Sequence, residues 1–250
     1  MNILLTNDDG IQAVGLRSLY HALLRAGHEV RVVAPVTEMS AVGHAVTLAA
    51  PLRVKEFDEK DFKGQGVSGT PADCVKLGLT TLLDSPPDLV VSGINAGANV
   101  GVDILYSGTV SAATEGALMG LPALAVSYDD FAPTDLSGQG DYAASLIARL
   151  DWTSLPKHCV VNLNFPALPV DRTKGLRVCP QTRAAYDDWY EERVDPRGRK
   201  YYWLTGVIPP EKVSPGKDRA LLSDGYITLT PLRFDFTDRE TMSLLSHLAQ

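Results

Sequence analysis

Two adjacent aspartates, Asp8 and Asp9, follow a short apolar run at residues 3–5 and precede Gly10. Neighbouring carboxylates repel each other unless a cation or water lies between them. A plain turn is the alternative interpretation, because aspartate and glycine are common turn residues. The position of the pair directly after an expected buried strand favours a cation site. The plain turn remains a possible interpretation at this point.

Two later segments add oxygen ligands of the same kind. Ser40 follows a second apolar run, and Asn95 follows a third that ends at Ser92-Gly93. Ligands of open α/β sheets bind at the carboxyl ends of the strands, where such loops can converge. Asp8, Asp9, Ser40 and Asn95 would then form an oxygen set without Cys or His, which suits Mg²⁺, Mn²⁺ or Ca²⁺ better than zinc. Taken singly, Ser40 and Asn95 are equally compatible with solvated loop residues.

The glycine-rich segment 93–109 also contains Asn99 and ends in Tyr106-Ser107-Gly108-Thr109, directly before an expected helix. Backbone N–H groups at a helix start bind anions, and phosphate is a common occupant. The alternative is a flexible loop with Thr109 as the N-cap. No Gly-Lys-Ser/Thr follows and no GxGxxG is present, so neither a P-loop nor NAD binding is predicted.

His44 is the one histidine in the candidate site region; it either contacts substrate or is a loop residue without a role.

Alternating strand and helix patterns must position these residues. Residues 3–5, 16–24 and 30–33 predict strand, helix and strand, with Gly27 ending the helix, and thus a parallel βαβ unit. Thr70-Pro71 predicts a capped helix start. The remaining predictions are β segments within 46–69 with a turn at 63–66, strands at 88–93, 123–127 and 160–163, and helices at 109–119 and 141–150. The pattern predicts a Rossmann-like, doubly wound α/β fold with a mostly parallel sheet.

The last hundred residues differ in character. Residues 183–204 carry six Tyr and Trp side chains around the turn Asp195-Pro-Arg-Gly198 and predict a β-hairpin arm; a strand at 227–229 and a terminal helix at 238–249 follow. A lone two-stranded hairpin is marginal in water, so something must cover these aromatics. They either pack against the sheet of the same subunit or exchange with a neighbouring subunit.

Composition narrows the class of protein. The 250 residues include 45% hydrophobic and 21% charged residues and carry a net charge of −7, which fits a globular chain and argues against binding of nucleic-acid duplexes. Three widely spaced cysteines (Cys74, Cys159 and Cys179) predict reduced thiols and a cytoplasmic protein. We expect neither a signal peptide nor a transmembrane helix.

Two other classes of protein that handle phosphate are excluded, because this chain lacks the aspartates that they require. In haloacid-dehalogenase-type phosphatases the nucleophilic aspartate would fall at Asn7, which cannot form an aspartyl-phosphate. Receiver domains need a phosphoacceptor aspartate at the end of a central strand, where this chain has Ser92-Gly93.

The chain resembles the SurE family, the survival-protein nucleotidases, over nearly its whole length. The matching motifs are NDDG at 7–10, AP at 34–35 followed by Ser40, GTPADCV at 69–75, SGINAG at 92–97, YSGTVSAATEG at 106–116, GLPALAVS at 120–127, DPRG with YYW at 195–203 and GYITLTPL at 225–232. Departures from the family pattern are Ala41 for glycine, His44 for asparagine and Ala98 for proline. The first two bear on substrate preference and leave the metal ligands intact.

The resemblance implies a metal-dependent phosphatase of nucleoside 5′- and 3′-monophosphates that forms homodimers or homotetramers with exchanged C-terminal segments. It maps the ligands of one Mg²⁺ or Mn²⁺ per subunit to Asp8, Asp9, Ser40 and Asn95. We expect one domain, residues 1–250, with a Rossmann-like core at 1–165 and an oligomerisation region at 166–250.

The mechanism we expect is direct hydrolysis without a covalent intermediate. Asp8 or Asp9 orients or deprotonates a metal-activated water. His44, Asn99, Ser107, Gly108 and Thr109 hold substrate and phosphate. The competing class is a non-enzymatic regulator that binds Mg²⁺ or nucleotide through the same loops.

Overall fold

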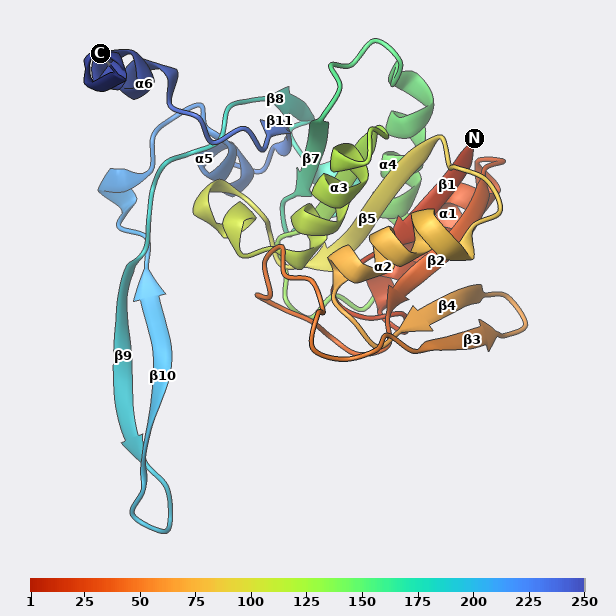
Figure 1. Cartoon of the computed structure of the whole chain (residues 1–250), viewed down its shortest axis with the longest axis horizontal. Coiled ribbons are helices and arrows are strands. Elements are labelled where there is room, and N and C mark those ends of the chain that lie inside the picture. The colour runs from red at the N-terminus through yellow and green to blue at the C-terminus, as the bar shows by residue number, and fades with distance from the viewer. Residues whose placement is uncertain (250) are drawn as a thin grey trace.

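Five apolar strands form the centre of this computed structural model, which describes residues 1–249 (Figure 1). They are β1 (Asn2–Thr6), β2 (Glu29–Pro35), β5 (Leu89–Ala96), β6 (Ala123–Tyr128) and β7 (Cys159–Phe165). They lie parallel in the order β2-β1-β5-β6-β7. Helices cover both faces of the sheet, which explains why these strands are nearly continuous apolar runs. The predicted Rossmann-like, mostly parallel fold is confirmed.

Shorter strands extend both edges of this sheet. At one edge β4 (Lys63–Val67) runs parallel to β2, and β3 (Val54–Asp58) pairs antiparallel with β4. At the other edge β11 (Ile227–Arg233) pairs antiparallel with β7, and β8 (Leu176–Val178) runs parallel to β11. The antiparallel pairs make the sheet mixed at its edges, and β11 confirms the late strand.

The turn predicted at residues 63–66 is wrong, because these residues belong to β4. Gly64 and Gly66 serve close packing there: a Cβ on Gly64 would lie 2.9 Å from Val32 Cβ, and one on Gly66 would lie 2.6 Å from a ring carbon of Phe57. The chain turns one step earlier, where the Glu59 N–H donates to the Phe62 carbonyl at 2.8 Å.

Four helices form the outer layers. α1 (Val14–Arg25) and α4 (Ser137–Arg149) pack together over one face, and α2 (Pro71–Leu77) and α3 (Gly108–Leu118) pack together over the other. α2 begins at the predicted cap, with a capping box between Thr70 and Asp73, and continues into a π-helical turn, Gly78–Leu82. α4 starts four residues before its predicted start at 141.

Strand β5 continues past Gly93, where the sequence pattern predicted its end. Gly93 has φ of +140°, and a Cβ there would lie 2.3 Å from the Val126 carbonyl oxygen, so glycine is required. The register with β6 shifts between Ser92 and Asn95, and Asn95 pairs with Ser127. The glycine-rich segment 93–109 therefore begins as strand and includes the 3-10 turn Gly101–Leu105.

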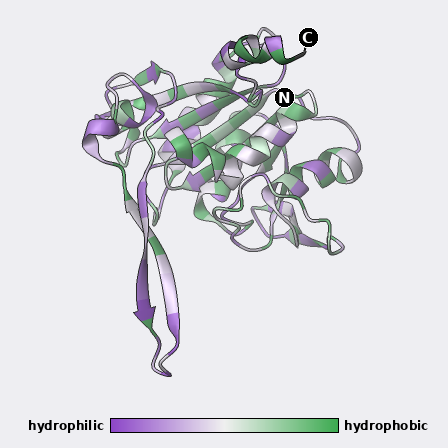
Figure 2. Ribbon diagram, turned by 60° about the vertical axis from the view of Figure 1, so that its left-hand side comes forward, coloured by the Kyte–Doolittle hydropathy of each residue, from purple (hydrophilic) through white to green (hydrophobic). Residues whose placement is uncertain are grey.

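The predicted hairpin arm is present, as β9 (Asp187–Val194) and β10 (Lys200–Val207) joined at the predicted turn. It projects away from the body and forms its own two-stranded sheet (Figure 1). Figure 2 shows it mainly purple and white, in contrast to the green interior of the sheet. Its aromatic side chains are exposed: Trp203 by 59% and Tyr190 by 67%. The interpretation that they pack against the sheet of the same subunit is therefore wrong.

The remaining C-terminal elements are short. They are α5 (Asp218–Ser223), α6 (Arg239–Leu245) and the 3-10 turns Val170–Arg172, Pro210–Lys212 and Ser246–Ala249. α6 confirms the terminal helix; the residues of α6 are exposed along its whole length. None of the helices in residues 1–249 combines the length and apolarity needed to cross a membrane.

Candidate active site

The candidate site lies at the carboxyl ends of β1 and β5. β1 leads to β2 on one side and β5 on the other, so the strand order reverses here and opens a crevice of the kind that binds ligands in α/β folds. Asp8 and Asp9 follow β1. Asn95 lies near the end of β5, among the last residues of this strand that pair with β6. The Ala96 N–H donates to Asp9 Oδ2 at 3.1 Å. The structure thus brings the loop of Asn95 against the aspartate pair.

Asp8 is held at the start of α3. Its side chain is buried, with the residue 4% exposed, and the Thr109 hydroxyl donates to Asp8 Oδ1. A Cβ on Gly108 would lie 2.8 Å from Asp8 Cβ, so the absence of a side chain at Gly108 permits this approach. The carboxylate of Asp8 therefore shares the helix start that the sequence assigned to phosphate, where the helix dipole favours negative charge.

Ser107, rather than Thr109, is the N-cap of α3. The Val110 N–H donates to Ser107 Oγ at 3.0 Å. The interpretation of Thr109 as a cap in a flexible loop is therefore wrong, since Thr109 lies inside the helix and is fully buried. Its hydroxyl is directed to Asp8 as a result.

Burial dominates the electrostatics of the aspartate pair. Burial raises the pKa of Asp8, and this effect outweighs the hydrogen bonds from Thr109 and from the Gly108 amide, which lower it. Burial, the charge of Asp8 and the charge of Glu38 raise the pKa of Asp9 to about 7, against the hydrogen bond from Ala96. Burial and mutual repulsion thus disfavour the state in which both carboxylates are charged. A bound cation would offset this repulsion.

The donor chemistry fits a hard divalent cation. The Asn95 side-chain Nδ2 donates to the Gly97 carbonyl at 2.7 Å, so Oδ1 is the side-chain atom of Asn95 that could bind a cation. Across residues 1–249 no cluster of three or more His, Cys, Asp and Glu side chains could hold a metal. A cation here would therefore depend on amide and hydroxyl oxygens beside the two carboxylates, a set that suits Mg²⁺ or Mn²⁺.

Ser40 lies on a loop that reaches the aspartate pair through its backbone. The Met39 N–H donates to the Asp8 carbonyl at 2.8 Å. The Ser40 side chain is exposed, and its hydroxyl donates to Glu38 Oε1 at 2.6 Å. The structure thus places this loop beside Asp8 and directs the Ser40 hydroxyl to Glu38.

His44, in the loop after β2, and Lys76, on α2, both contact Glu115 of α3. His44 Nε2 lies 2.8 Å from Glu115 Oε2, and Lys76 Nζ donates to Glu115 Oε1 at 2.5 Å. Glu115 is 5% exposed, and the hydrogen bonds from His44 and Lys76 hold its pKa below the usual range. Glu115 was not among the residues predicted from the sequence, although it is the lone acid in a helix of small, mostly uncharged residues.

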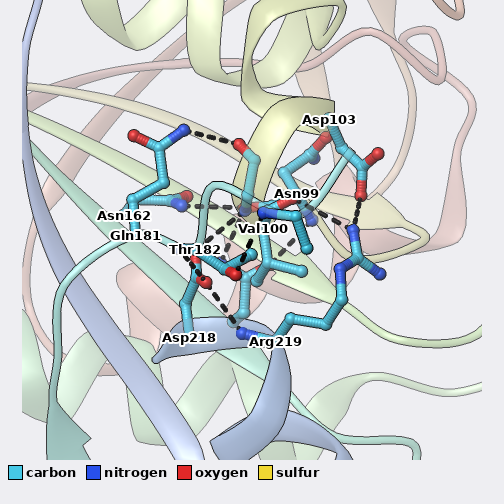
Figure 3. Close-up of polar contacts among 11 residues, drawn as sticks. Asn99, Val100, Asp103, Asn162, Gln181, Thr182, Asp218 and Arg219 are labelled. Carbon is cyan, nitrogen blue, oxygen red and sulfur yellow. Dashed lines mark hydrogen bonds and ion pairs between the residues drawn. The ribbon is translucent and has the colours of Figure 1, made fainter. Parts of the chain in front are cut away.

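Asn99 is fixed in a buried amide network (Figure 3). Its Nδ2 donates to Ser127 Oγ at 2.8 Å, and its N–H donates to Asn164 Oδ1 at 2.8 Å. Asn162 donates to the Asn99 carbonyl at 2.8 Å and Asn164 does so at 3.2 Å. Asn162 and Asn164 were not among the residues predicted from the sequence, although two amides at alternate positions of a buried strand indicate a polar role on one face of the sheet.

Comparison with known proteins finds matches over most of the chain. The family model described as "Survival protein SurE" matches residues 3–188. A protein of Nitratidesulfovibrio vulgaris (strain DSM 19637 / Miyazaki F), named 5′-nucleotidase SurE, is 71% identical over 99% of this chain and 92% of its own length. A protein of Maridesulfovibrio salexigens with the same name is 69% identical over 98% of each chain.

A solved structure shares the fold as well as the sequence pattern. The crystal structure of SurE protein from Aquifex aeolicus superposes with a TM-score of 0.86 at 35% identity, and the match covers 100% of both chains. Since the family model covers most of the chain and relatives match it from end to end, this chain belongs to the SurE family.

Proposed function

We propose that this chain is a metal-dependent phosphomonoesterase that hydrolyses nucleoside 5′- and 3′-monophosphates to nucleoside and phosphate. The names of its relatives support nucleotidase activity. The observation that carries the assignment is the pair of buried Asp8 and partly exposed Asp9 beside the Asn95 loop, at the start of α3. This arrangement combines a cation site with a helix start that favours anions.

We assign one divalent cation, Mg²⁺ or Mn²⁺, to Asp8, Asp9, Asn95 and Ser40. The Ser40 hydroxyl oxygen keeps lone pairs for a cation while its proton is donated to Glu38. When bound, the cation would polarise a phosphoryl oxygen and lower the pKa of water.

The residues of the chain then have separate roles in the hydrolysis. Asp9, which is less buried than Asp8, accepts a proton from the attacking water; Asp8 is oriented by Thr109. The water oxygen forms a bond to phosphorus while the bond to the nucleoside oxygen breaks, and the proton taken by Asp9 passes through water to the departing nucleoside oxygen, so no covalent phosphoenzyme forms. Ser107, the amides of Gly108 and Thr109, Asn99 and His44 contact the phosphate and substrate.

Assembly and location are further parts of the proposal. The exposed arm and α6 support a homodimer or homotetramer in which residues 166–250 contact a neighbouring subunit. Cys74, Cys159 and Cys179 are free in the described chain, which supports a cytoplasmic location.

Phosphate release tests the proposed activity. The rate of phosphate release from AMP is measured before EDTA, after EDTA, and after adding back Mg²⁺ or Mn²⁺. The proposal requires loss with EDTA and recovery with the metal. Full activity after exhaustive chelation would refute metal dependence, and metal-dependent nucleotide binding without turnover would identify a regulator instead.

A further inference from the structure

The loop between Asn99 and Ser107 is held from the C-terminal part of the chain (Figure 3). Asp218, at the start of α5, is fully buried. Its carboxylate accepts hydrogen bonds from the N–H groups of Gly101 at 2.8 Å, Thr182 at 2.7 Å and Arg219 at 2.8 Å. One buried charge therefore joins the site loop to two C-terminal segments, with hydrogen bonds that compensate its burial.

Arg219 adds a second attachment to the same loop. Its guanidinium is paired with the Asp103 carboxylate and donates to the Val100 carbonyl at 3.2 Å. The two side chains of this pair are 21% and 22% exposed, so solvent screens the pair less than it screens a surface ion pair. Gln181 contributes a third attachment, from Nε2 to the Gly101 carbonyl at 2.6 Å.

Further hydrogen bonds connect Asp103 to Ser107, the N-cap of α3, where we place the phosphate. The Asp103 carbonyl accepts hydrogen bonds from the N–H groups of Tyr106 and Ser107, each at 3.0 Å. Ser107 in turn caps α3 through Val110. α3 has its own support, because Val110, Ala113 and Ala117 pack against β6 and β7. Release of Arg219 should therefore loosen the loop rather than the helix or Asp8.

We propose that Arg219 and Asp218 are positioning residues for hydrolysis: they hold loop 99–107 so that Asn99 and Ser107 meet the phosphate. This inference rests on the proposed function. It separates two parts of the site, because the metal ligands follow β1 and β2 or lie in β5, whereas Asn99 and Ser107 lie at the two ends of a loop that the C-terminal segment holds. Loss of Arg219 should weaken phosphate binding and leave metal binding intact.

The test is a double-mutant cycle of Arg219→Gln and Asp103→Asn. The measurements are KM and kcat for AMP, the inhibition constant of inorganic phosphate, and Mn²⁺ affinity without substrate. Each single variant should raise KM and the phosphate constant by about tenfold, and the double variant should be no worse than the singles. Mn²⁺ affinity should stay within about twofold of wild type, because we expect the metal site to be independent of the loop that Arg219 and Asp103 hold. Arg25→Gln is the matched control, since Arg25 pairs with Asp141 at 2.6 Å between α1 and α4.

Two results overturn the inference alone: constants for AMP and phosphate that stay at wild-type values in an active Arg219→Gln chain, or effects of the two substitutions that simply add. A lower melting temperature without a change in KM would equally reduce Arg219 to a structural role. A wild-type chain that neither releases phosphate from AMP nor binds inorganic phosphate would overturn the proposed function, and this inference with it.

Discussion

Asp8 and Asp9 are neighbours in the chain and have different surroundings. Asp8 is buried against α3 and held by Thr109, whereas Asp9 is partly exposed and takes one backbone hydrogen bond from Ala96. The pair itself was predictable from its place after an apolar run. The partner Thr109, 101 residues away, was not, because no local pattern links the two.

Thr109→Val tests the orientation of Asp8. The substitution keeps the shape and removes the hydroxyl that donates to Asp8, which leaves a buried acceptor without this partner. We expect turnover to fall and the free energy of unfolding to fall by about 1–3 kcal/mol. Phosphate release and urea unfolding measure the two effects. Thr109→Ser, which keeps the hydroxyl, is the control, and equal activity of the valine and serine variants would contradict the role.

Glu115→Gln tests the cluster of His44, Glu115 and Lys76 through pH. Hydrogen bonds from His44 and Lys76 lower the pKa of Glu115, so the ionised carboxylate stabilises the folded chain above the usual glutamate pKa. This contribution is lost as pH falls through the lowered pKa. At neutral pH the variant should be less stable by about 1–3 kcal/mol, because a charged hydrogen-bond acceptor is gone.

The difference in unfolding free energy between wild type and Glu115→Gln should then shrink in acid, below the usual glutamate pKa. Urea unfolding of both proteins at neutral and acid pH measures it. A difference that is the same at both pH values would show that the charge of Glu115 contributes nothing.

At the scale of elements, apolar runs and capping residues predicted the strands and helices that form the core. Glycines misled the prediction in two places. Gly64 and Gly66 looked like turn residues and instead allow close packing of β4, and Gly93 looked like a strand end and instead lies within β5. A glycine pattern alone does not distinguish a chain reversal from a close approach of neighbouring atoms.

Gly108→Ala tests the close contact between the start of α3 and Asp8, in the turn after β1. The added Cβ would lie 2.8 Å from Asp8 Cβ and 3.1 Å from Pro71 Cγ, so the helix start must shift. We expect a loss of about 1–3 kcal/mol from overpacking, together with a steep loss of phosphate release. Gly138→Ala is the control, because its nearest neighbour would be 3.9 Å away. Wild-type activity and stability of Gly108→Ala would contradict the account.

At the scale of the molecule, contacts between distant segments complete the site. Gly101 and Asp218 are 117 residues apart, and Asn99 and Asn164 are 65 apart. Sequence periodicity identifies each segment but not which segments meet. The predicted candidate residues therefore needed the folded chain to reveal the partners that orient them.

Deletion of the arm tests the assembly. Residues 187–207 would be replaced by a short Gly-Ser bridge, which removes exposed side chains including Trp189, Tyr190 and Trp203. If the arm holds subunits together, light scattering should show a smaller species than the full-length chain. A truncated chain that keeps the native mass would show that the subunits meet through another surface.

The turnover number of Asp9→Asn, measured with AMP at saturating Mn²⁺, is the most direct test of metal-assisted hydrolysis at the aspartate pair. The substitution keeps the size of the side chain and removes the group that we assign both to the cation and to the proton of the attacking water. We expect the turnover number to fall on the order of 100-fold or more. Near-wild-type turnover in a folded Asp9→Asn protein would contradict this expectation and place the chemistry elsewhere.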